Sequence, residues 1–296
     1  MNINHLAIFY AVYQEGSISI GAERLHISQP AVSKQLKELE TSLKTALFDR
    51  GPKGVRPTEA GKLLSGYAHR IFALETEAET AMAELDGLTR GKLTIGASLT
   101  IGNYLLPIIL SRFHMQYPGV VIDVEIANTV TVQNKLIEGT LDLGLTEGYV
   151  ESADLEVEIF SEDELVPVAP PEHPIFESSP VSLERLCRED FVLRERGSGT
   201  REVMERAIAE QGYSLHAVMS LGDIEAVKRA VAAGIGIGII SGHALSMELA
   251  AGILRRIDVE GFTVKRPLHF LTSRKRYRSK AVQALTPLIM NKAYHS

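Results

Sequence analysis

Hydrophobic residues recur every three or four positions over the first forty residues, which predicts three short helices in succession. Gly16 ends the first helix, and Ser17 or Ser19 can cap the second. Ser28 can cap the third helix, whose Pro30 falls in the first turn, where a missing N–H costs nothing. The apolar positions of this third helix are Val32, Leu36 and Leu39. Their i, i+4, i+7 spacing points them inward and leaves the opposite side exposed.

The exposed side of the third helix carries side chains that suit DNA. Gln29 can pair bidentately with adenine, and Ser33 can bond either kind of base edge. Lys34 and Lys37 can reach guanine or phosphate. A helix, a three-residue turn and a helix form the geometry that lets a recognition helix enter the major groove. On residue types alone, an ordinary solvated helix face explains this surface equally well.

The segment after the third helix favours the DNA-binding interpretation. Residues 47–50 predict a short strand and residues 51–57 a Gly/Pro-shaped basic turn with a return strand, and Thr58 can cap the helix that follows. Such a hairpin is a wing. Arg50, Lys53 and Arg56 would lie against the flanking sugar-phosphate backbone, where they add affinity without reading sequence.

These elements resemble one known family. The residues that carry the resemblance are 22–33 (AERLHISQPAVS), 47–50 (LFDR) and 57–61 (PTEAG). With them, the first sixty residues resemble the LysR-type transcriptional regulators, in which they form a winged helix-turn-helix that binds promoter DNA as a dimer. Ile20 and Gly21 depart from the basic residue and alanine usual in the family, and Lys44 replaces a usual helix-ending glycine.

The resemblance and the residue types together define the expected DNA-contacting set. It consists of Ser28, Gln29, Pro30, Ser33, Lys34, Lys37, Arg50 and Lys53. The resemblance itself implies contact by five of them, namely Gln29, Pro30, Ser33, Lys34 and Lys53.

A long helix is predicted after the wing, because about thirty residues from Thr58 contain no proline. Apolar residues follow one another at intervals of three and four: Leu63, Tyr67, Ile71, Leu74, Ala78, Ala81 and Leu85. This is the 3.5-residue seam of a coiled coil, which a second copy of the chain could cover. The alternative is a helix packed on its own domain. Residues 87–91 then mark a hinge.

The C-terminal two hundred residues alternate strands and helices. The expected strands are 92–97, 120–127, 141–145, 165–169, 191–194, 217–220, 236–240 and 267–271, with helices at 103–115, 130–138 and 280–291 among others. Alternation of this kind predicts parallel βαβ units. The pattern restarts after Ser161 and the chain returns near Pro267, so we expect two α/β lobes with a cleft between them. Such clefts bind small ligands.

Hydroxyl groups and helix N-termini follow several of these strands. The expected ligand-binding residues are Ser98, Thr100, Thr146, Ser198, Gly199 and Thr200. Exposed N–H groups and hydroxyls form a cradle for a small anion without a full positive charge. Ordinary helix capping is the competing explanation for each serine or threonine taken singly. Arg194, Arg196 and Arg201 could add charge, and the sequence does not say which of them faces the cleft.

This half is similar to the effector domain of the same regulators, itself similar to type 2 periplasmic binding proteins. The hydroxyls at Ser98, Thr100, Thr146 and Ser198 resemble those of the sulfur-assimilation activators, which bind sulfur oxyanions and an acylated serine. Ile101 stands where those proteins place a polar side chain. The expected effector is therefore either a sulfur oxyanion or a small carboxylate.

Composition and motifs argue against catalysis and against a membrane location. Of 296 residues, 45% are hydrophobic and 23% charged, which is typical of globular proteins, and a lone cysteine fits a reducing compartment. The first 65 residues carry eight Lys/Arg against six Asp/Glu, while the whole chain has net charge −6. Residues 96–100 (GASLT) lack the last glycine of a nucleophile elbow, and residues 234–238 (GIGIG) lack dinucleotide-motif spacing. No secretory signal or spanning segment is expected.

The sequence therefore predicts a multi-domain protein: an all-α winged helix-turn-helix head at 1–58, a dimerising linker helix and hinge at 59–90, and an effector-binding α/β domain at 91–296. Lobe one of that domain comprises 91–161 and 268–296, and lobe two comprises 162–267. We expect a cytoplasmic transcriptional regulator without enzyme activity, cofactor or metal, controlled by a small anion. Its expected partners are double-stranded promoter DNA and further copies of the chain, as a dimer with a tetramer favoured, and RNA polymerase is a further candidate. The alternative is a cytosolic anion-binding protein or hydrolytic enzyme with a helical head that does not bind DNA.

Overall fold

The computed structural model describes residues 2–51, 54–83 and 91–291. The chain forms two compact units, Met1–Glu79 and Thr80–Ser296. Lys53, Leu85 and most of the expected hinge lie outside the described residues, as does the side chain of Arg50.

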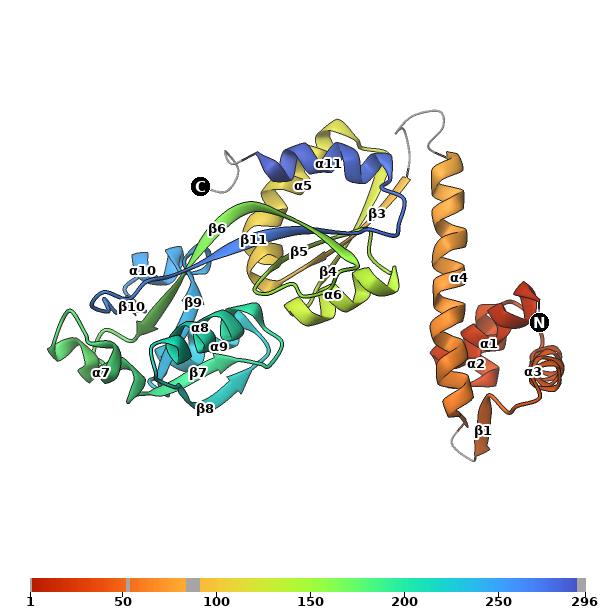
Figure 1. Cartoon of the computed structure of the whole chain (residues 1–296), viewed down its shortest axis with the longest axis horizontal. Helices are drawn as coiled ribbons and strands as arrows, with labels where there is room; N and C mark the ends of the chain where they lie inside the picture. The colour runs from red at the N-terminus through yellow and green to blue at the C-terminus, as the bar shows by residue number, and fades with distance from the viewer. Residues whose placement is uncertain (1, 52–53, 84–90, 292–296) are drawn as a thin grey trace. The chain divides into compact units, whose positions relative to one another are not determined.

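The first unit is a helical head with a two-stranded wing (Figure 1). Its elements are α1 (Ile3–Glu15), α2 (Ile18–Arg24), α3 (Gln29–Leu43), β1 (Phe48–Gly51), β2 (Gly54–Pro57) and α4 (Glu59–Ala83). Ser17 and Ser28 cap α2 and α3 by accepting a backbone N–H. Helix α3 ends at the position expected, because Lys44 adopts the left-handed conformation (φ 54°) in which the family usually has glycine. The predicted helices and wing are thus confirmed.

The core of the head is built from the apolar positions that the pattern selects. Phe9 packs its ring against the rings of Tyr13 and Phe48, and so joins α1 to the wing. The Glu40 carboxylate of α3 accepts the backbone N–H of Leu47 at 2.8 Å, which fixes the start of the wing to α3.

Helix α4 has two apolar faces. On one face, Ala68 is fully buried and Leu64, Ile71 and Phe72 pack against the core of the head. On the other face lie exposed apolar side chains: Leu63, Tyr67, Leu74 and Met82. The predicted coiled-coil seam therefore does not lie wholly on the exposed face. Its member Ile71 packs on the head, whereas Leu63, Tyr67 and Leu74 remain exposed.

The second unit contains one mixed sheet of nine strands within the described residues, in the order β4-β3-β5-β11-β6-β9-β7-β8, with β10 paired to β6. The strands are β3 (Gly91–Ala97), β4 (Val120–Ile126), β5 (Leu143–Glu147), β6 (Leu155–Ala169), β7 (Asp190–Arg194), β8 (His216–Leu221), β9 (Ile237–Ser241), β10 (Arg255–Arg256) and β11 (Val264–Ser273). The helices are η2 (Ile101–Leu105), α5 (Leu106–Gln116), α6 (Thr129–Glu138), η3 (Pro174–Glu177), α7 (Leu183–Cys187), α8 (Gly199–Glu210), α9 (Ile224–Ala232), η4 (Gly242–Ala244), α10 (Ser246–Ala250) and α11 (Lys280–Met290).

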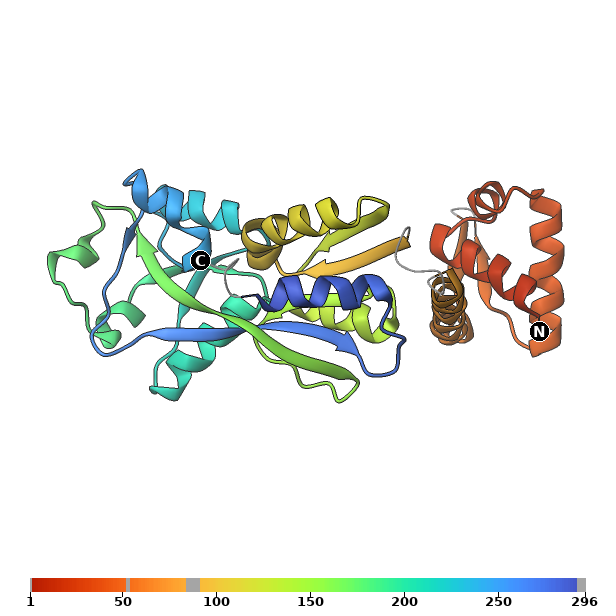
Figure 2. The same cartoon turned by 90° about the horizontal axis from the view of Figure 1, so that it is seen from above.

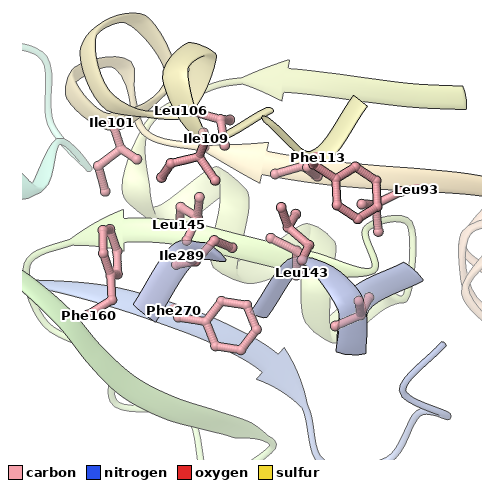
Figure 3. Packing of buried hydrophobic residues seen from close by; sticks show 14 of the residues in the cluster. Leu93, Ile101, Leu106, Ile109, Phe113, Leu143, Leu145, Phe160, Phe270 and Ile289 are labelled. Atoms are coloured by element: carbon pink, nitrogen blue, oxygen red, sulfur yellow. The ribbon is translucent and has the colours of Figure 1, made fainter. Parts of the chain in front are cut away.

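Two lobes result from this order. In lobe one, β3, β4 and β5 are parallel, with α5 and α11 on one face of the sheet and α6 on the other (Figure 1). Figure 3 shows the core beneath α5 and α11, where Phe113, Leu143, Phe270 and Ile289 meet. In lobe two, β7, β8 and β9 are parallel, and the buried residues of α8 and α9 belong to separate apolar clusters.

The crossing between the lobes differs from the sequence prediction. The expected short strands 165–169 and 267–271 are parts of β6 and β11, which pair antiparallel from Val264–Leu165 to Ser273–Leu155 (green and blue in Figure 2). The first half of β6 alternates acidic with apolar residues and was not among the expected strands; its pairing with β11 makes it a strand. Both strands run continuously through the expected lobe boundaries at 161/162 and 267/268, which stay predictions.

Candidate functional site

The outward face of α3 presents the polar residues expected to contact DNA. Gln29, Pro30, Lys34 and Lys37 are exposed, and Ser33 is half-buried. The hydroxyl of Ser28 is used inside the head, where it accepts the Ala31 N–H. Lys34 is 78% exposed, and its Nζ is 3.9 Å from the Glu38 carboxylate, a distance at which an exposed pair holds the lysine only weakly.

The wing is fixed to the head beside its turn, at the start of β2. The N–H of Val55 donates to the carbonyl of Gly16 at 3.3 Å, at the end of α1. Gly54 has φ +110°, and a Cβ there would lie 2.8 Å from that same carbonyl oxygen, so glycine is required. Arg56 on β2 is exposed, and Arg50 lies on β1. The backbone thus presents the wing at a defined place beside α1.

In the second unit, Arg266 of β11 is a buried cation at the junction of the lobes. Its side chain is fully buried, and its Nε and Nη2 donate to Asp163 Oδ2 of β6 at 2.8 and 2.7 Å. Its Nη1 donates to Thr200 Oγ1 of lobe two at 2.9 Å, and its Nη2 lies 3.5 Å from Thr100 Oγ1 of lobe one. One guanidinium therefore joins both lobes to the crossing strands.

A second carboxylate, that of Glu147, completes this buried cluster. Glu147 ends β5 and is 2% exposed. It accepts a hydrogen bond from the Ser98 hydroxyl, and its Oε1 is 3.4 Å from Arg266 Nη1. Asp163 in turn accepts from Ser241 Oγ at 2.9 Å, and His243 Nε2 lies 3.9 Å from it. One guanidinium therefore faces two carboxylates.

The lobes touch where the expected loops meet. A Cβ on Gly199, the first residue of α8, would lie 2.3 Å from the carbonyl oxygen of Glu147, so only glycine allows this approach. Gly148 has φ +91°, and a Cβ there would lie 2.9 Å from Gly199 Cα. Beside this contact, the Val130 N–H of α6 donates to the Gly197 carbonyl at 3.3 Å.

Several hydroxyls at this junction do not serve ordinary helix capping. Thr100 precedes η2 and Ser198 precedes α8, yet neither side chain caps its helix. Within the part of the chain that the structure describes, Thr146 Oγ1 is buried without a hydrogen-bond partner, as is Nδ1 of its cross-strand neighbour His269. Burial lowers the pKa of His269, which keeps its imidazole neutral.

Of the six expected ligand residues, Thr100 and Thr200 contact Arg266, while Ser98 and Gly199 contact Glu147. No described hydrogen bond joins the Thr146 or Ser198 hydroxyl to this cluster. The structure supplies positive charge from an arginine other than the three considered. Arg194 is buried and pairs with Glu195, while Arg201 pairs with Glu205 and donates to the Arg194 carbonyl. Arg196 is exposed. The cation at the junction is Arg266, which the sequence reasoning missed.

A signal for the missed residues was present in the strand pattern. Arg266 shares the buried positions of β11 with Val264 and Leu268, and Glu147 ends β5, whose residues are all buried. Asp163 stands two residues before the buried Leu165 in the same way. Charged side chains almost never lie at buried positions unless they are paired. Charged residues at the buried positions of these strands therefore indicate a buried ionic cluster.

A second polar contact links the lobes away from Arg266. The Tyr104 hydroxyl of lobe one donates to Glu225 of α9 at 2.6 Å. Lys228 Nζ of α9 is buried and lies 2.7 Å from Glu225 and 2.6 Å from Glu248. Burial alone would lower the pKa of Lys228, but its hydrogen bonds to Glu225, Glu248 and Tyr104 outweigh this and raise its pKa well above the usual value.

The geometry gives the hydrolytic alternative no support. The Ser98 hydroxyl donates to a carboxylate, and no described hydrogen bond joins Ser98 to a histidine. Within residues 2–51, 54–83 and 91–291, no group of three or more His, Cys, Asp or Glu is arranged to hold a metal ion. Over the same residues, no helix has the length and apolar character to cross a membrane. Burial raises the pKa of the half-buried Cys187 thiol, which disfavours the reactive thiolate.

Comparisons with known proteins agree on one family. Residues 3–62 match the model of the bacterial regulatory helix-turn-helix protein, lysR family, and residues 86–292 match that of the LysR substrate binding domain. The RuBisCO operon transcriptional regulator of Allochromatium vinosum is 35% identical over 293 residues, which cover 99% of this chain and 97% of that protein.

Two solved structures share the fold. Full-length OxyR from Pseudomonas aeruginosa superposes with a TM-score of 0.74 at 23% identity, covering 98% of this chain and 94% of that one. The regulatory domain of Synechocystis CcmR, in complex with 2-PG (2-phosphoglycolate), has a TM-score of 0.63 at 27% identity and covers 68% of this chain and 96% of that one. The matches span both units, and the chain belongs to the LysR family of bacterial transcriptional regulators.

Proposed function

We propose that this chain regulates carbon-fixation genes and that a small anion, bound between the two lobes, controls its action at the promoter. The observation that carries the proposal is the buried Arg266, which bonds hydroxyls of both lobes, Thr100 and Thr200. A cation with donors from both lobes favours an anion that both lobes hold at once. The gene class is inferred from the RuBisCO operon regulator that is 35% identical along the whole chain. Promoter control implies action in the cytoplasm.

We infer that the effector is a small phosphorylated carboxylate, in preference to the sulfur oxyanion considered from sequence alone. Support comes from CcmR, whose regulatory domain binds 2-phosphoglycolate and is 27% identical to this chain. Phosphate and carboxylate both accept from hydroxyl donors and from guanidinium groups. The proposed binding set is Ser98, Thr100, Thr146, Ser198, Gly199 and Thr200, together with Arg266.

Removing either of two of these hydroxyls should abolish the response of the protein to its effector. In Thr100→Val and Ser198→Ala, a donor that does not cap its own helix is lost, so we expect the thermal stabilisation by millimolar 2-phosphoglycolate to disappear. Thermal shift of the full-length protein measures this. The exposed positions Thr140 and Ser178 supply matched controls, Thr140→Val and Ser178→Ala, which should respond as the wild type does. A normal response in both site variants would contradict the proposed cradle.

We propose that the exposed stripe of α4 joins two copies of the chain. Leu63 and Leu74 are 67% and 64% exposed and share this face with the exposed Tyr67 and Met82. An exposed apolar patch of this kind marks a protein contact. Leu74→Glu places a charge in this stripe and should shift the protein to monomer at micromolar concentration in sedimentation velocity. Glu75→Lys, on the neighbouring exposed position, should leave the assembly unchanged. An oligomer of unchanged size in Leu74→Glu would place the interface elsewhere.

A further inference from the structure

We propose that the Glu147 carboxylate acts as an internal competitor for the effector: in this structure it occupies the anion-binding position, and it must leave before an external anion binds. This inference rests on the proposed function of the junction. It makes Glu147 the residue that sets the threshold concentration of the effector.

The contacts of Glu147 are those that an anion at this place would use. Its carboxylate takes the hydroxyl of Ser98 and lies 3.4 Å from Arg266 Nη1, while only 2% of the residue is exposed. A carboxylate is stable in so dry a place only through partners of this kind. An effector carboxylate or phosphate would need the same hydroxyl and guanidinium, and Glu147 already contacts both.

The charges of the cluster show why two anions do not fit together. Arg266 is already matched by Asp163, whose Oδ2 is 2.7 and 2.8 Å from two of its nitrogens. Glu147 therefore adds a second negative charge to a single positive one. A further anion beside Glu147 would face strong repulsion, because charges at such separations interact strongly where water is excluded.

Glu147 is also the carboxylate that is held less firmly. Each carboxylate accepts from one serine hydroxyl, Ser98 for Glu147 and Ser241 for Asp163. The difference lies in Arg266, which is 3.4 Å from Glu147 but donates two hydrogen bonds to Asp163 at 2.7 and 2.8 Å. An entering anion would accordingly displace Glu147 and leave the Arg266–Asp163 pair in place.

Displacement of Glu147 would alter the contact between the lobes, because the backbone of Glu147 is part of that contact. Its backbone carbonyl accepts from Thr129 Oγ1 at 3.0 Å and abuts Gly199 at the start of α8. The next residue, Gly148, has φ +91° and also lies against Gly199. A change at Glu147 is thus transmitted to the point where lobe two meets lobe one, which gives the effector a route to alter the arrangement of the lobes.

The test replaces Glu147 by glutamine, which keeps an acceptor for Ser98 and removes the charge. We expect full-length Glu147→Gln to bind 2-phosphoglycolate and inorganic phosphate roughly tenfold more tightly or better in isothermal titration calorimetry. Glu147→Ala should do the same, which covers a failure of the glutamine variant to fold. Glu147→Asp keeps the charge and should not gain this affinity. Glu151→Gln removes an exposed acid from the following loop and should leave affinity unchanged.

The outcomes separate this inference from the proposed function. If the wild type binds 2-phosphoglycolate and neither neutral variant binds it more tightly, Glu147 is not a competitor, while the anion site stands. Weaker binding by both neutral variants would show that Glu147 instead accepts a donor group of the ligand, which also overturns the inference. If neither the wild type nor any variant binds either anion, both the competitor role and the anion effector are wrong. Binding by the neutral variants alone would support the competitor role directly.

Discussion

Replacing Arg266 by methionine should lower the free energy of unfolding of the second unit by about 3–5 kcal/mol, because it leaves a buried carboxylate without its cation. Asp163 would lose both of its guanidinium hydrogen bonds, and Glu147 would lose the only cation near it among the described ion pairs. Thr100 and Thr200 would each lose a donor, so the two lobes would also be less firmly joined. Chemical denaturation of the full-length protein, followed by circular dichroism, measures the loss.

The pair Arg256–Glu164, one residue along β6 from Asp163, supplies a matched control. Arg256 is 51% exposed and pairs with Glu164 of β6, so Arg256→Met should cost at most about 1 kcal/mol. The double variant Arg266→Met/Asp163→Leu should recover part of the stability, since an apolar replacement of a whole buried pair is often tolerated. If Arg266→Met costs no more than Arg256→Met, Arg266 does not hold the lobes together.

Helix starts and short strands could be predicted from the sequence, because both depend on residues close together in the chain. Ser17 and Ser28 begin helices because a serine side chain can satisfy a backbone N–H three residues on, and this is visible in the sequence. Strands β3 to β5 and β7 to β9 were predicted to within a few residues, because each is a short segment with apolar and β-branched residues that alternates with helical patterns. The length of β6 could not be predicted, since its acidic first half is a strand only through pairing with β11 about a hundred residues later.

The candidate site, like the fold, was predictable from the sequence only where its features depend on local signals. Thr100 and Ser198 were proposed because they precede expected helices, and the structure places them directly before η2 and α8. The contacts of Thr100 and Thr200 with Arg266 were not predicted, because Arg266 lies 166 and 66 residues away from them in the sequence and nothing local links them. The charge balance of the site, with two carboxylates on one guanidinium, follows from packing and became visible only in three dimensions.

Replacing Ser33 and Lys34 together by alanine should weaken binding to a cognate operator by at least about a hundredfold, while affinity for the effector stays unchanged. Both residues lie on the outward side of α3, and Val32 and Leu36 beside them are buried, so the change removes DNA-facing groups without touching the core. Loss of one base-edge contact and one lysine contact corresponds to roughly 3 kcal/mol. Fluorescence anisotropy with an operator fragment selected by the wild-type protein measures this.

The salt dependence of the same measurement distinguishes recognition from a general loss of charge. Removing a lysine that contacts phosphate should reduce the slope of log K against log salt by about one and weaken all sequences alike, whereas removing a base contact should reduce discrimination between operator and random DNA. The control Ser178→Ala/Lys92→Ala removes the same residue types from exposed positions in the second unit and should bind the operator as the wild type does. If the Ser33/Lys34 variant keeps wild-type operator affinity, α3 is not the recognition helix. The DNA contacts proposed for Gln29, Pro30 and Lys37, which share that face, would then be wrong as well.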